Sequence, residues 1–334
     1  MKCLPVFPLV LSSMLVALPA PAQVRSPLRP VHTYSIVAAD SVTGEIGVAV
    51  QSHWFSVGSI VSWARPGVGA VATQSFVEPA YGPRGIYLMT SGLSAPEALA
   101  ALLRSDPDSQ VRQVAMVDAR GNVLAHTGSL NIPAAGHHMG RNYSVQANLM
   151  RNSDVWPAMA RAFESASGDL AARMLAALKA AESAGGDIRG RQSAALVVVS
   201  GDPSDPSWER LFDLRIEDSS DPLGELERLI TVARAYRAAT DGDNYITAGH
   251  VDSALIAYSA AARYLPDEAT NGELVYWQAV TMLDQGDLES SIPLFRRAFQ
   301  QDESWIELLR RLPQVGLLNV AAGTIDQVVE QARR

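Results

Sequence analysis

The sequence predicts a layered α+β domain followed by an all-α domain. Between Thr33 and about residue 218, strand-like apolar runs alternate with helical patterns. Several runs, such as AALVVV at 194–199, are apolar on both faces. Strands of this kind lie in sheets that helices or a second sheet cover on each side. After Pro222 the pattern becomes continuously helical, so we expect a second domain there.

The first 22 residues have the layout of a cleaved signal peptide. A single lysine precedes an apolar run, and small residues surround the expected cleavage point after Ala22. We therefore expect a periplasmic or secreted protein in which residues 23–32 form a short N-terminal segment. Cys3, the only cysteine, would leave with the signal, so neither a lipid anchor nor a disulfide is expected. No apolar run reaches the roughly 20 residues of a membrane-spanning helix.

Turn signals divide the first domain, expected over residues 33–220, into its elements. Gly44 separates the first two strands, Gly67 precedes the third, and a helix-start signal at 94–97 follows a break at Gly92. The expected strands are 33–40, 45–52, 68–75, two runs within 111–129, 143–150, 192–200 and 211–218. The expected helices are 83–103, broken at Gly92, and a pair within 153–182.

The helical domain, residues 221–334, carries a weak internal repeat. Each of its two units has a glycine, a small residue, an aromatic residue and a second small residue at similar spacing. In the first unit these are Gly249, Ala254, Tyr258 and Ala261, and in the second they are Gly286, Ser291, Phe295 and Ala298. The offset of 37 residues is slightly longer than the roughly 34 of tetratricopeptide repeats, which this spacing resembles. We expect helical hairpins that bury small residues where helices touch.

Composition and motifs exclude several functions. A net charge of −8 disfavours binding to nucleic acid or to an anionic membrane. The chain has no glycine-flanked catalytic serine, no HExxH and no phosphate loop. GVGAVA at 67–72 leads into a strand, which is wrong for a dinucleotide site. His137 and His138 are expected in a loop without a ligand cluster, so we predict no metal and no cofactor.

Four segments together are similar to one bacterial and archaeal family. They are TYSIVAADSVTGEIGVAVQS from Thr33, WARPGVGAVATQ, YGPRG at 81–85, and GGDIRGRQSAALVVV at 185–199. In this order they resemble the family called domain of unknown function 1028, over about residues 33–229. That family is grouped with the N-terminal-nucleophile hydrolases, and some members carry a C-terminal module proposed to bind peptidoglycan. The first hairpin also resembles the isoaspartyl-peptidase branch of that superfamily.

The resemblance implies a four-layered αββα sandwich of the N-terminal-nucleophile hydrolase type, with Thr33 as nucleophile. A threonine hydroxyl is a poor nucleophile, but a free α-amine on the same residue, with a pKa of about 8, can take its proton. This chemistry requires cleavage of the bond between residues 32 and 33, since cutting after Ala22 leaves ten residues ahead of Thr33.

The remaining candidate residues each have a catalytic and a structural interpretation. His53 and Asn148 are candidate catalytic residues beside Thr33. The candidate substrate-binding residues are Gln74, Arg84, Gln146, Asp187 and Arg191. The amides could form an oxyanion hole or could satisfy buried backbone groups. Asp187 and Arg191 could clamp a substrate carboxylate or pin their own loop.

Two functional hypotheses follow. The first is an exported amidohydrolase that acts on a small peptide-like, acyl-amine or cell-wall substrate. The second is a non-catalytic binding protein on an inactive hydrolase scaffold, which uses its helical tail to bind a protein or peptidoglycan. A homodimer is expected from the way members of the superfamily assemble.

Overall fold

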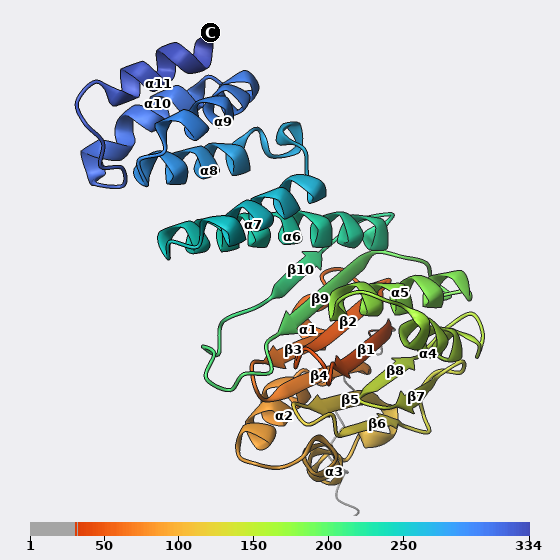
Figure 1. The fold of residues 1–334 in the computed structure, drawn as a ribbon. Helices are drawn as coiled ribbons and strands as arrows, with labels where there is room; N and C mark the ends of the chain where they lie inside the picture. The colour runs from red at the N-terminus through yellow and green to blue at the C-terminus, as the bar shows by residue number, and fades with distance from the viewer. Residues whose placement is uncertain (1–30, 32) are drawn as a thin grey trace, which may run out of the picture.

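The computed structural model describes residues 31 and 33–334. The predicted signal peptide, residues 1–22, and the rest of the N-terminal segment lie outside the described residues. The protein is α+β, with two β-sheets and many helices, of which the last lie in a C-terminal helical region (Figure 1). In the part of the chain that is described, no helix is long and apolar enough to cross a membrane.

The larger sheet has six antiparallel strands in the order β10-β9-β2-β1-β8-β7. Its strands are β1 Thr33–Ala39, β2 Ile46–Ser52, β7 Gly136–Gly140, β8 Tyr143–Ala147, β9 Ser193–Val199 and β10 Phe212–Ile216. The predicted first hairpin forms because Gly44 adopts a left-handed φ of 77° in the turn that joins β1 to β2. The strand β1 therefore lies in the interior of the sheet, between β2 and β8.

The smaller sheet has four antiparallel strands in the order β3-β4-β5-β6. They are β3 Ser62–Arg65, β4 Gly69–Ser75, β5 Arg112–Asp118 and β6 Val123–Thr127. The short edge strand β3 was not predicted from the sequence. It pairs only with residues 69–72 of β4 and leaves the last three residues of β4 without a β3 partner.

The prediction that His137 and His138 lie in a loop is wrong, because both belong to the edge strand β7. His137 stands opposite Gln146 of β8. Its ring lies 2.8 Å from the hydroxyl of Thr127 on β6. The histidine thus takes part in a contact between the two sheets, which depends on how the sheets stack and leaves no periodic signal in the sequence.

The two sheets face each other across an apolar layer. Side chains alternate between the two faces of each strand, so one residue in two points into this layer. Its buried members include Val37, Ile46, Val48, Val50, Ala70, Ala72, Ala115, Val117, Ala195, Val197 and Val199. The alternate residues of the same strands point to the opposite, helix-covered faces.

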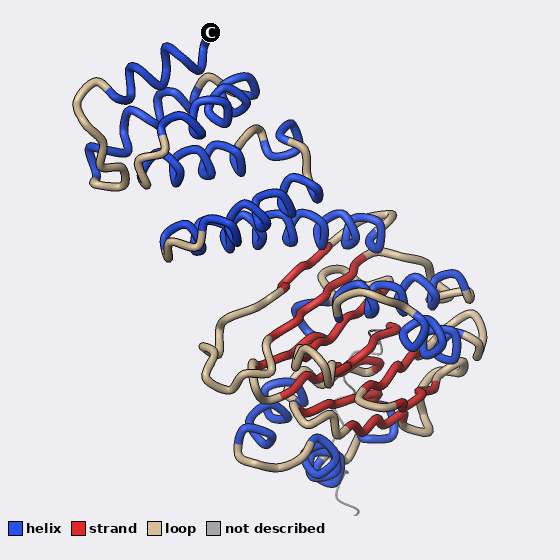
Figure 2. The backbone as a smooth tube through the Cα atoms, viewed as in Figure 1, coloured by secondary structure: helices blue, strands red, loops and turns tan. Residues whose placement is uncertain are grey.

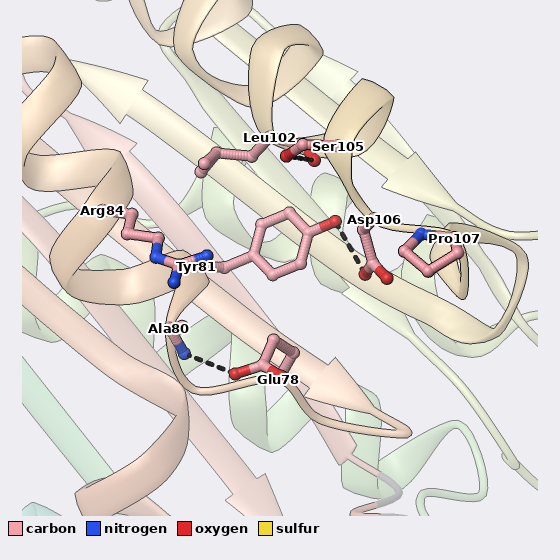
Figure 3. Close-up of a pocket in the computed structure, with 8 residues that line it drawn as sticks. All are labelled: Glu78, Ala80, Tyr81, Arg84, Leu102, Ser105, Asp106 and Pro107. Carbon is pink, nitrogen blue, oxygen red and sulfur yellow. Dashed lines mark hydrogen bonds between the residues drawn. The ribbon is translucent and has the colours of Figure 1, made fainter.

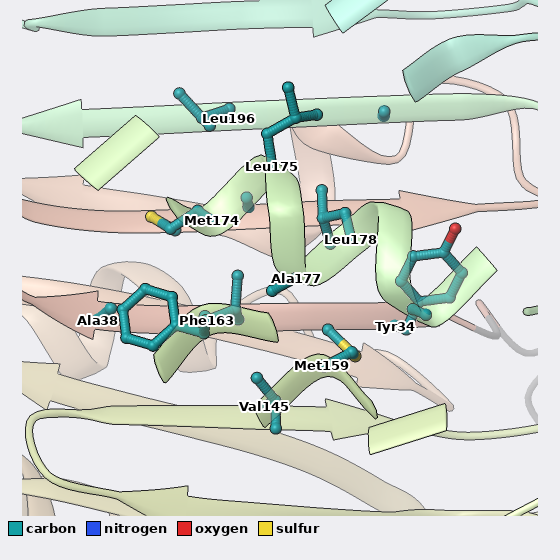
Figure 4. Packing of buried hydrophobic residues seen from close by; sticks show 14 of the residues in the cluster. Tyr34, Ala38, Val145, Met159, Phe163, Met174, Leu175, Ala177, Leu178 and Leu196 are labelled. Carbon is teal, nitrogen blue, oxygen red and sulfur yellow. The ribbon is translucent and has the colours of Figure 1, made fainter. Parts of the chain in front are cut away.

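Helices cover the outer face of each sheet. The helices α4 (Val155–Ser165) and α5 (Leu170–Ser183) pack on the six-stranded sheet, where Phe163 lies beside Ala38 of β1 and Met174 lies against Gly47 of β2 (Figure 4). The helices α2 (Tyr81–Thr90) and α3 (Ala95–Ser105) pack on the four-stranded sheet. As predicted, the break between them contains Gly92, and Ser94 caps α3. A single turn, α1 (Gly58–Val61), follows β2.

The C-terminal region consists of helices, of which the first lies against the six-stranded sheet and those after the second stand away from the sheets (Figure 2). The helices are α6 Pro222–Thr247, α7 Val251–Tyr264, α8 Glu273–Asp284, α9 Leu288–Gln301, α10 Ser304–Arg311 and α11 Thr324–Arg333. Short 3-10 turns lie at Ser109–Val111, Asp267–Thr270 and Leu312–Val315. The repeat positions correspond in space: Gly249 and Gly286 turn between helices, and both aromatics, Tyr258 and Phe295, are buried.

The long helix α6 belongs to both parts of the molecule. Its first half buries Leu223, Leu226 and Ile230 in the core that α4 and α5 share with the six-stranded sheet. The guanidinium of Arg234 also binds the carboxylate of Asp169, the N-cap residue of α5, at 3.0 and 2.6 Å. The division expected at residue 220 stays a prediction, and any truncation there would expose side chains whose burial stabilises the fold by about 1.5–3 kcal/mol each.

Candidate functional site

Seven of the eight predicted site residues gather at one end of the two sheets. Antiparallel neighbours alternate in direction, so the start of β1 meets the ends of β2 and β8 and the start of β9. At that end lie Thr33 of β1, His53 after β2, Gln146 and Asn148 at the end of β8, Asp187 and Arg191 before β9, and Gln74 of β4. The eighth residue, Arg84, lies elsewhere, on the outer side of the smaller sheet.

Thr33 begins the interior strand β1, and its hydroxyl is buried between the sheets. Its side chain is fully buried, and its Oγ1 donates to the carbonyl oxygen of Val31 at 3.0 Å. Directly across the ladder, Thr33 faces Ser52 of β2, which in turn faces Ser193 of β9. Residues opposite each other in an antiparallel pair share a face of the sheet, so three hydroxyl side chains form a row at this edge.

The backbone carbonyl of Thr33 is held by three donors. The backbone N–H of Asn148 donates to it at 3.1 Å and its side-chain amide at 3.4 Å. The amide of Gln74, which comes from the facing sheet, donates at 3.2 Å. These contacts fix the first residue of β1 relative to both sheets.

The amides around Thr33 form one connected network in the layer between the sheets. The oxygen of the Gln113 side chain accepts from Gln74 at 2.6 Å and from Asn148 at 2.8 Å. The nitrogen of Gln113 donates to the hydroxyl of Thr127 and to the backbone oxygens of residues 136 and 147. Burial, and then the rings of His126 and His138, lower the pKa of His137 at the end of this chain. Because every donor has an acceptor, the network can be buried at little cost.

A second arm of the network runs through Ser35. Its hydroxyl donates to the Gln74 oxygen at 2.6 Å and accepts from the Gln146 amide at 2.7 Å. Ser144 then donates to Gln146 at 2.9 Å. The amide donors of Gln74, Gln146 and Asn148 are thus engaged with protein groups. Two of these amides satisfy backbone carbonyls, which is the structural interpretation considered for them.

Sequence reasoning missed several members of this network. They are Ser35, Gln113, Thr127, His137 and Ser144. Their signal was present, because each is a polar residue on the inward face of its strand. What the pattern could not show was that the polar positions of two different sheets meet.

In the loop before β9, Asp187 is held by short hydrogen bonds, whereas Arg191 has longer contacts. The buried carboxylate of Asp187 accepts two bonds from Arg189, at 3.0 and 2.6 Å, and one from the backbone N–H of His53 at 3.3 Å. Within the described residues, Arg191, whose side chain is 43% exposed, forms longer ion pairs, at 3.6 Å to Glu182 and 3.5 Å to Asp221. Asp187 therefore pins the loop, whereas Arg191 presents its guanidinium at the surface.

Glu182 links this loop to β1. Its carboxylate accepts a bond from the hydroxyl of Tyr34 at 2.7 Å, on the helix-covered face of the strand. Burial, followed by the charge and hydrogen bond of Glu182, raises the pKa of the Tyr34 phenol well above its usual value. Tyr34 therefore stays protonated and acts as a hydrogen-bond donor.

Backbone strain is concentrated at the same end. Among the described residues, six that are not glycine have positive φ, and three of these, Ser56, Ser75 and Leu149, follow or end the strands β2, β4 and β8. A left-handed residue other than glycine costs about 1–3 kcal/mol and persists where the surrounding structure enforces it. Such residues are typical of functional sites.

Arg84 lines a separate pocket on the outer face of the smaller sheet (Figure 3). Here Tyr81 donates to Asp106 at 3.0 Å, and Asp106 pairs with Arg112 at 2.9 Å. Burial, and then the charge of Asp106, raise the pKa of Tyr81. The structure thus separates Arg84, which lies on α2, from the residues around Thr33.

Within residues 31 and 33–334, no three His, Cys, Asp or Glu side chains are placed to hold a metal ion. The segment GVGAVA leads into β4 and does not open a helix, so it lacks the geometry of a dinucleotide-binding turn.

Comparison with known proteins shows the family. The model of a family of unknown function, DUF1028, matches residues 33–226. A crystal structure of a DUF1028 protein from Silicibacter pomeroyi is similar, with 30% sequence identity and a TM-score of 0.54 over 60% of this chain and 89% of that one. No curated protein matches the chain.

Proposed function

The chain belongs to the DUF1028 family, and from that premise we propose that it is an amidohydrolase of the N-terminal-nucleophile type, with Thr33 as nucleophile. The observation that carries the proposal is the position of Thr33. It is the first residue of an interior strand, and its hydroxyl faces the layer between two helix-covered sheets. This layering is the arrangement that a four-layered αββα hydrolase of this type would have.

The first step is release of the segment that precedes Thr33. The Thr33 oxygen attacks the carbonyl carbon of residue 32, the C–N bond breaks, and the acyl group moves from nitrogen to oxygen. Water then hydrolyses the ester, which leaves a carboxylate on residue 32 and a free amine on Thr33. In the described state the hydroxyl is bonded to the Val31 oxygen, so it must leave that hydrogen bond before it reacts.

The released amine then serves as the base for substrate hydrolysis. With a pKa of about 8, it accepts the hydroxyl proton while the Thr33 oxygen attacks a substrate amide. The tetrahedral intermediate collapses, the proton passes to the leaving amine, and water hydrolyses the acyl ester. The amide network contributes by fixing the Thr33 carbonyl, and the exposed guanidinium of Arg191 is suited to a substrate carboxylate.

The rest of the chain completes the proposal. Residues 1–22 act as the export signal, and the protein works in the periplasm or outside the cell. The helical region is a tetratricopeptide-like module that binds a protein or peptidoglycan. The equivalence of its two helix pairs in turn glycines and buried aromatics supports this interpretation.

The test is the intact mass and N-terminal sequence of the exported protein, compared between wild type, Thr33→Ser and Thr33→Ala. We expect a terminus at Thr33 in the wild type, slower release in Thr33→Ser and none in Thr33→Ala. Recovery of a terminus at Gln23 from wild-type protein under all conditions, together with equal amidase activity in Thr33→Ala, would overturn the proposal.

A specific observation favours the second candidate function, a binding protein. The surface of α7 exposes an apolar set, Val251, Leu255, Ile256 and Tyr264. A pair of substitutions there, Leu255→Glu with Ile256→Glu, tests it better than truncation, because α6 shares the first core. Loss of partner capture, with capture kept in Thr33→Ala and in the exposed control Val42→Glu, would favour binding over catalysis. Unchanged capture would count against it.

A further inference from the structure

A short sheet edge beside Thr33 holds the chain that precedes it. The strand β3 pairs with residues 69–72 of β4 and stops, so the last residues of β4 have no β3 partner on that side. Val31 occupies this edge at Ser75. Its N–H donates to the Ser75 oxygen at 2.7 Å, and the Ser75 N–H donates to the Val31 oxygen at 2.9 Å.

Val31 and Thr33 thus belong to different sheets although they are two residues apart. Val31 extends the four-stranded sheet, while Thr33 begins β1 in the six-stranded sheet. The Val31 oxygen accepts from both Ser75 and the Thr33 hydroxyl. The site that holds residue 31 is therefore in direct contact with the proposed nucleophile.

The side chain of Val31 fills an apolar position. It is 1% exposed and belongs to the same cluster between the sheets as Val50, Val57 and Val61. The buried members of this cluster are all apolar side chains, so burial of a carboxylate or ammonium among them would be strongly unfavourable. The position is suited to a small branched aliphatic side chain.

Ser75 has two features that are unusual for a strand residue. Its φ is +72°, and its fully buried Oγ has no hydrogen-bond partner among the described residues. Strain and an unsatisfied polar atom are tolerated where a site requires them. Both occur at the residue whose backbone holds Val31.

We infer that this edge is the acyl-side substrate site: it binds an extended peptide through the backbone of Ser75 and selects Val or Ile two residues before the cleaved bond. The inference rests on the proposed function. Once the bond before Thr33 is cut, residues 31 and 32 are the acyl half of a cleaved peptide, so the place of Val31 is the place of the equivalent substrate residue. The backbone pairing is the mode by which peptides add to an open sheet edge.

The experiment uses the processed protein and hexapeptides with the sequence of residues 29–34, Arg-Pro-Val-His-Thr-Tyr, in which Val is replaced by Ile, Ala, Thr or Asp. Cleavage between His and Thr is followed by mass spectrometry, with Thr33→Ala protein as the blank. We expect kcat/KM for Val and Ile to exceed that for Thr and Asp by at least about tenfold. In the full chain, Val31→Thr should slow release of its own segment, whereas Val31→Ile should not.

The outcomes separate the two proposals. A Thr33 terminus with cleavage at equal rates for all peptides, or with no cleavage, overturns the substrate site and leaves the hydrolase proposal standing. If no Thr33 terminus forms, both proposals fall. A Thr33 terminus with the expected preference supports both.

Discussion

The carboxylate of Asp187 accepts hydrogen bonds from two nitrogens on one edge of the Arg189 guanidinium, at 3.0 and 2.6 Å, whereas Arg191, two residues on, forms ion pairs of 3.5 Å or longer with the described carboxylates. The Asp187 side chain is fully buried and Arg189 is 27% exposed. Removal of a partner from such a pair leaves a buried charge. Arg189 therefore has a structural role in this loop, whereas Arg191 contributes little to holding it.

We expect Arg189→Ala to lower the free energy of unfolding by about 2–3 kcal/mol, because Asp187 would keep only backbone donors. Arg191→Ala is the matched control and should lower it by less than about 1 kcal/mol, as exposed ion pairs contribute little. Urea unfolding of both variants measures the difference. Equal losses would show that Asp187 and Arg189 do not hold the loop as a unit.

Substitution by leucine should change the free energy of unfolding differently at two buried glutamines, Gln74 and Gln51. Gln74→Leu removes bonds to Thr33, Ser35 and Gln113 and should cost about 2–3 kcal/mol of stability. Gln51 is also fully buried, but neither atom of its amide has a partner among the described residues. Gln51→Leu should therefore be neutral or stabilising by up to about 1 kcal/mol. Urea unfolding measures both free energies, and a similar loss of stability in both variants would contradict this prediction.

Stability should fall in acid because of His137. Its pKa is lowered first by burial and then by His126 and His138. An unfolded histidine titrates near 6.5, so below about that pH the unfolded chain binds a proton that the folded chain does not. The contribution of neutral His137 to folding stability is complete above pH 6.5. It is lost as the pH falls towards the lowered pKa of the folded state. In His137→Gln the slope of unfolding free energy between pH 7 and 5 should be smaller than in wild type. The exposed control His250→Gln should keep the wild-type slope.

A half-buried carboxylate among the helices, that of Asp243, should give the unfolding free energy the opposite pH dependence. Asp243 accepts bonds from Tyr258 and Thr281, which joins α6, α7 and α8. Burial raises its pKa, and the two hydrogen bonds only partly oppose this. The ionised Asp243 carboxylate therefore lowers the free energy of unfolding at pH 7. This loss is reversed as the pH falls through the raised pKa and the carboxyl takes up a proton. Asp243→Asn should raise the melting temperature at pH 7 and lose this advantage in acid, whereas the exposed control Asp241→Asn should change little at either pH.

The turn glycines of the helical repeat can be compared directly. Gly249 and Gly286 have φ of 80° and 86°, and a Cβ at either would meet nothing within 4 Å. Alanine should therefore cost about 1–2 kcal/mol at each through backbone strain alone, and asparagine less. Thermal melts of the four single variants would test this, and a loss confined to one position would argue against the equivalence of the two helix pairs.

Local patterns predicted most of the elements correctly. The hairpin at Gly44, the break at Gly92 and the helix pair after residue 153 follow from turn residues and periodicity. Two of the four edge strands were not predicted: β3 was missed, and β7 was assigned to a loop at His137 and His138, whereas β6 and β10 fall within expected strands. The strand β3 has only four residues, and β7 begins and ends with glycine, so neither sequence carries a clear alternation signal.

The sequence by itself determined most of the order of strands and helices, the start of β1 at Thr33 and the repeat spacing of the tail, because these depend on periodicity and turn residues within a few positions. Only the tertiary structure decided which polar residues meet. The stacking of two sheets brings Gln74 and Gln113 to the Thr33 edge, seats Val31 against Ser75, and sends Arg84 to another face. These contacts join residues that are mostly tens of positions apart, and they depend on sheet order and register, which no local pattern encodes.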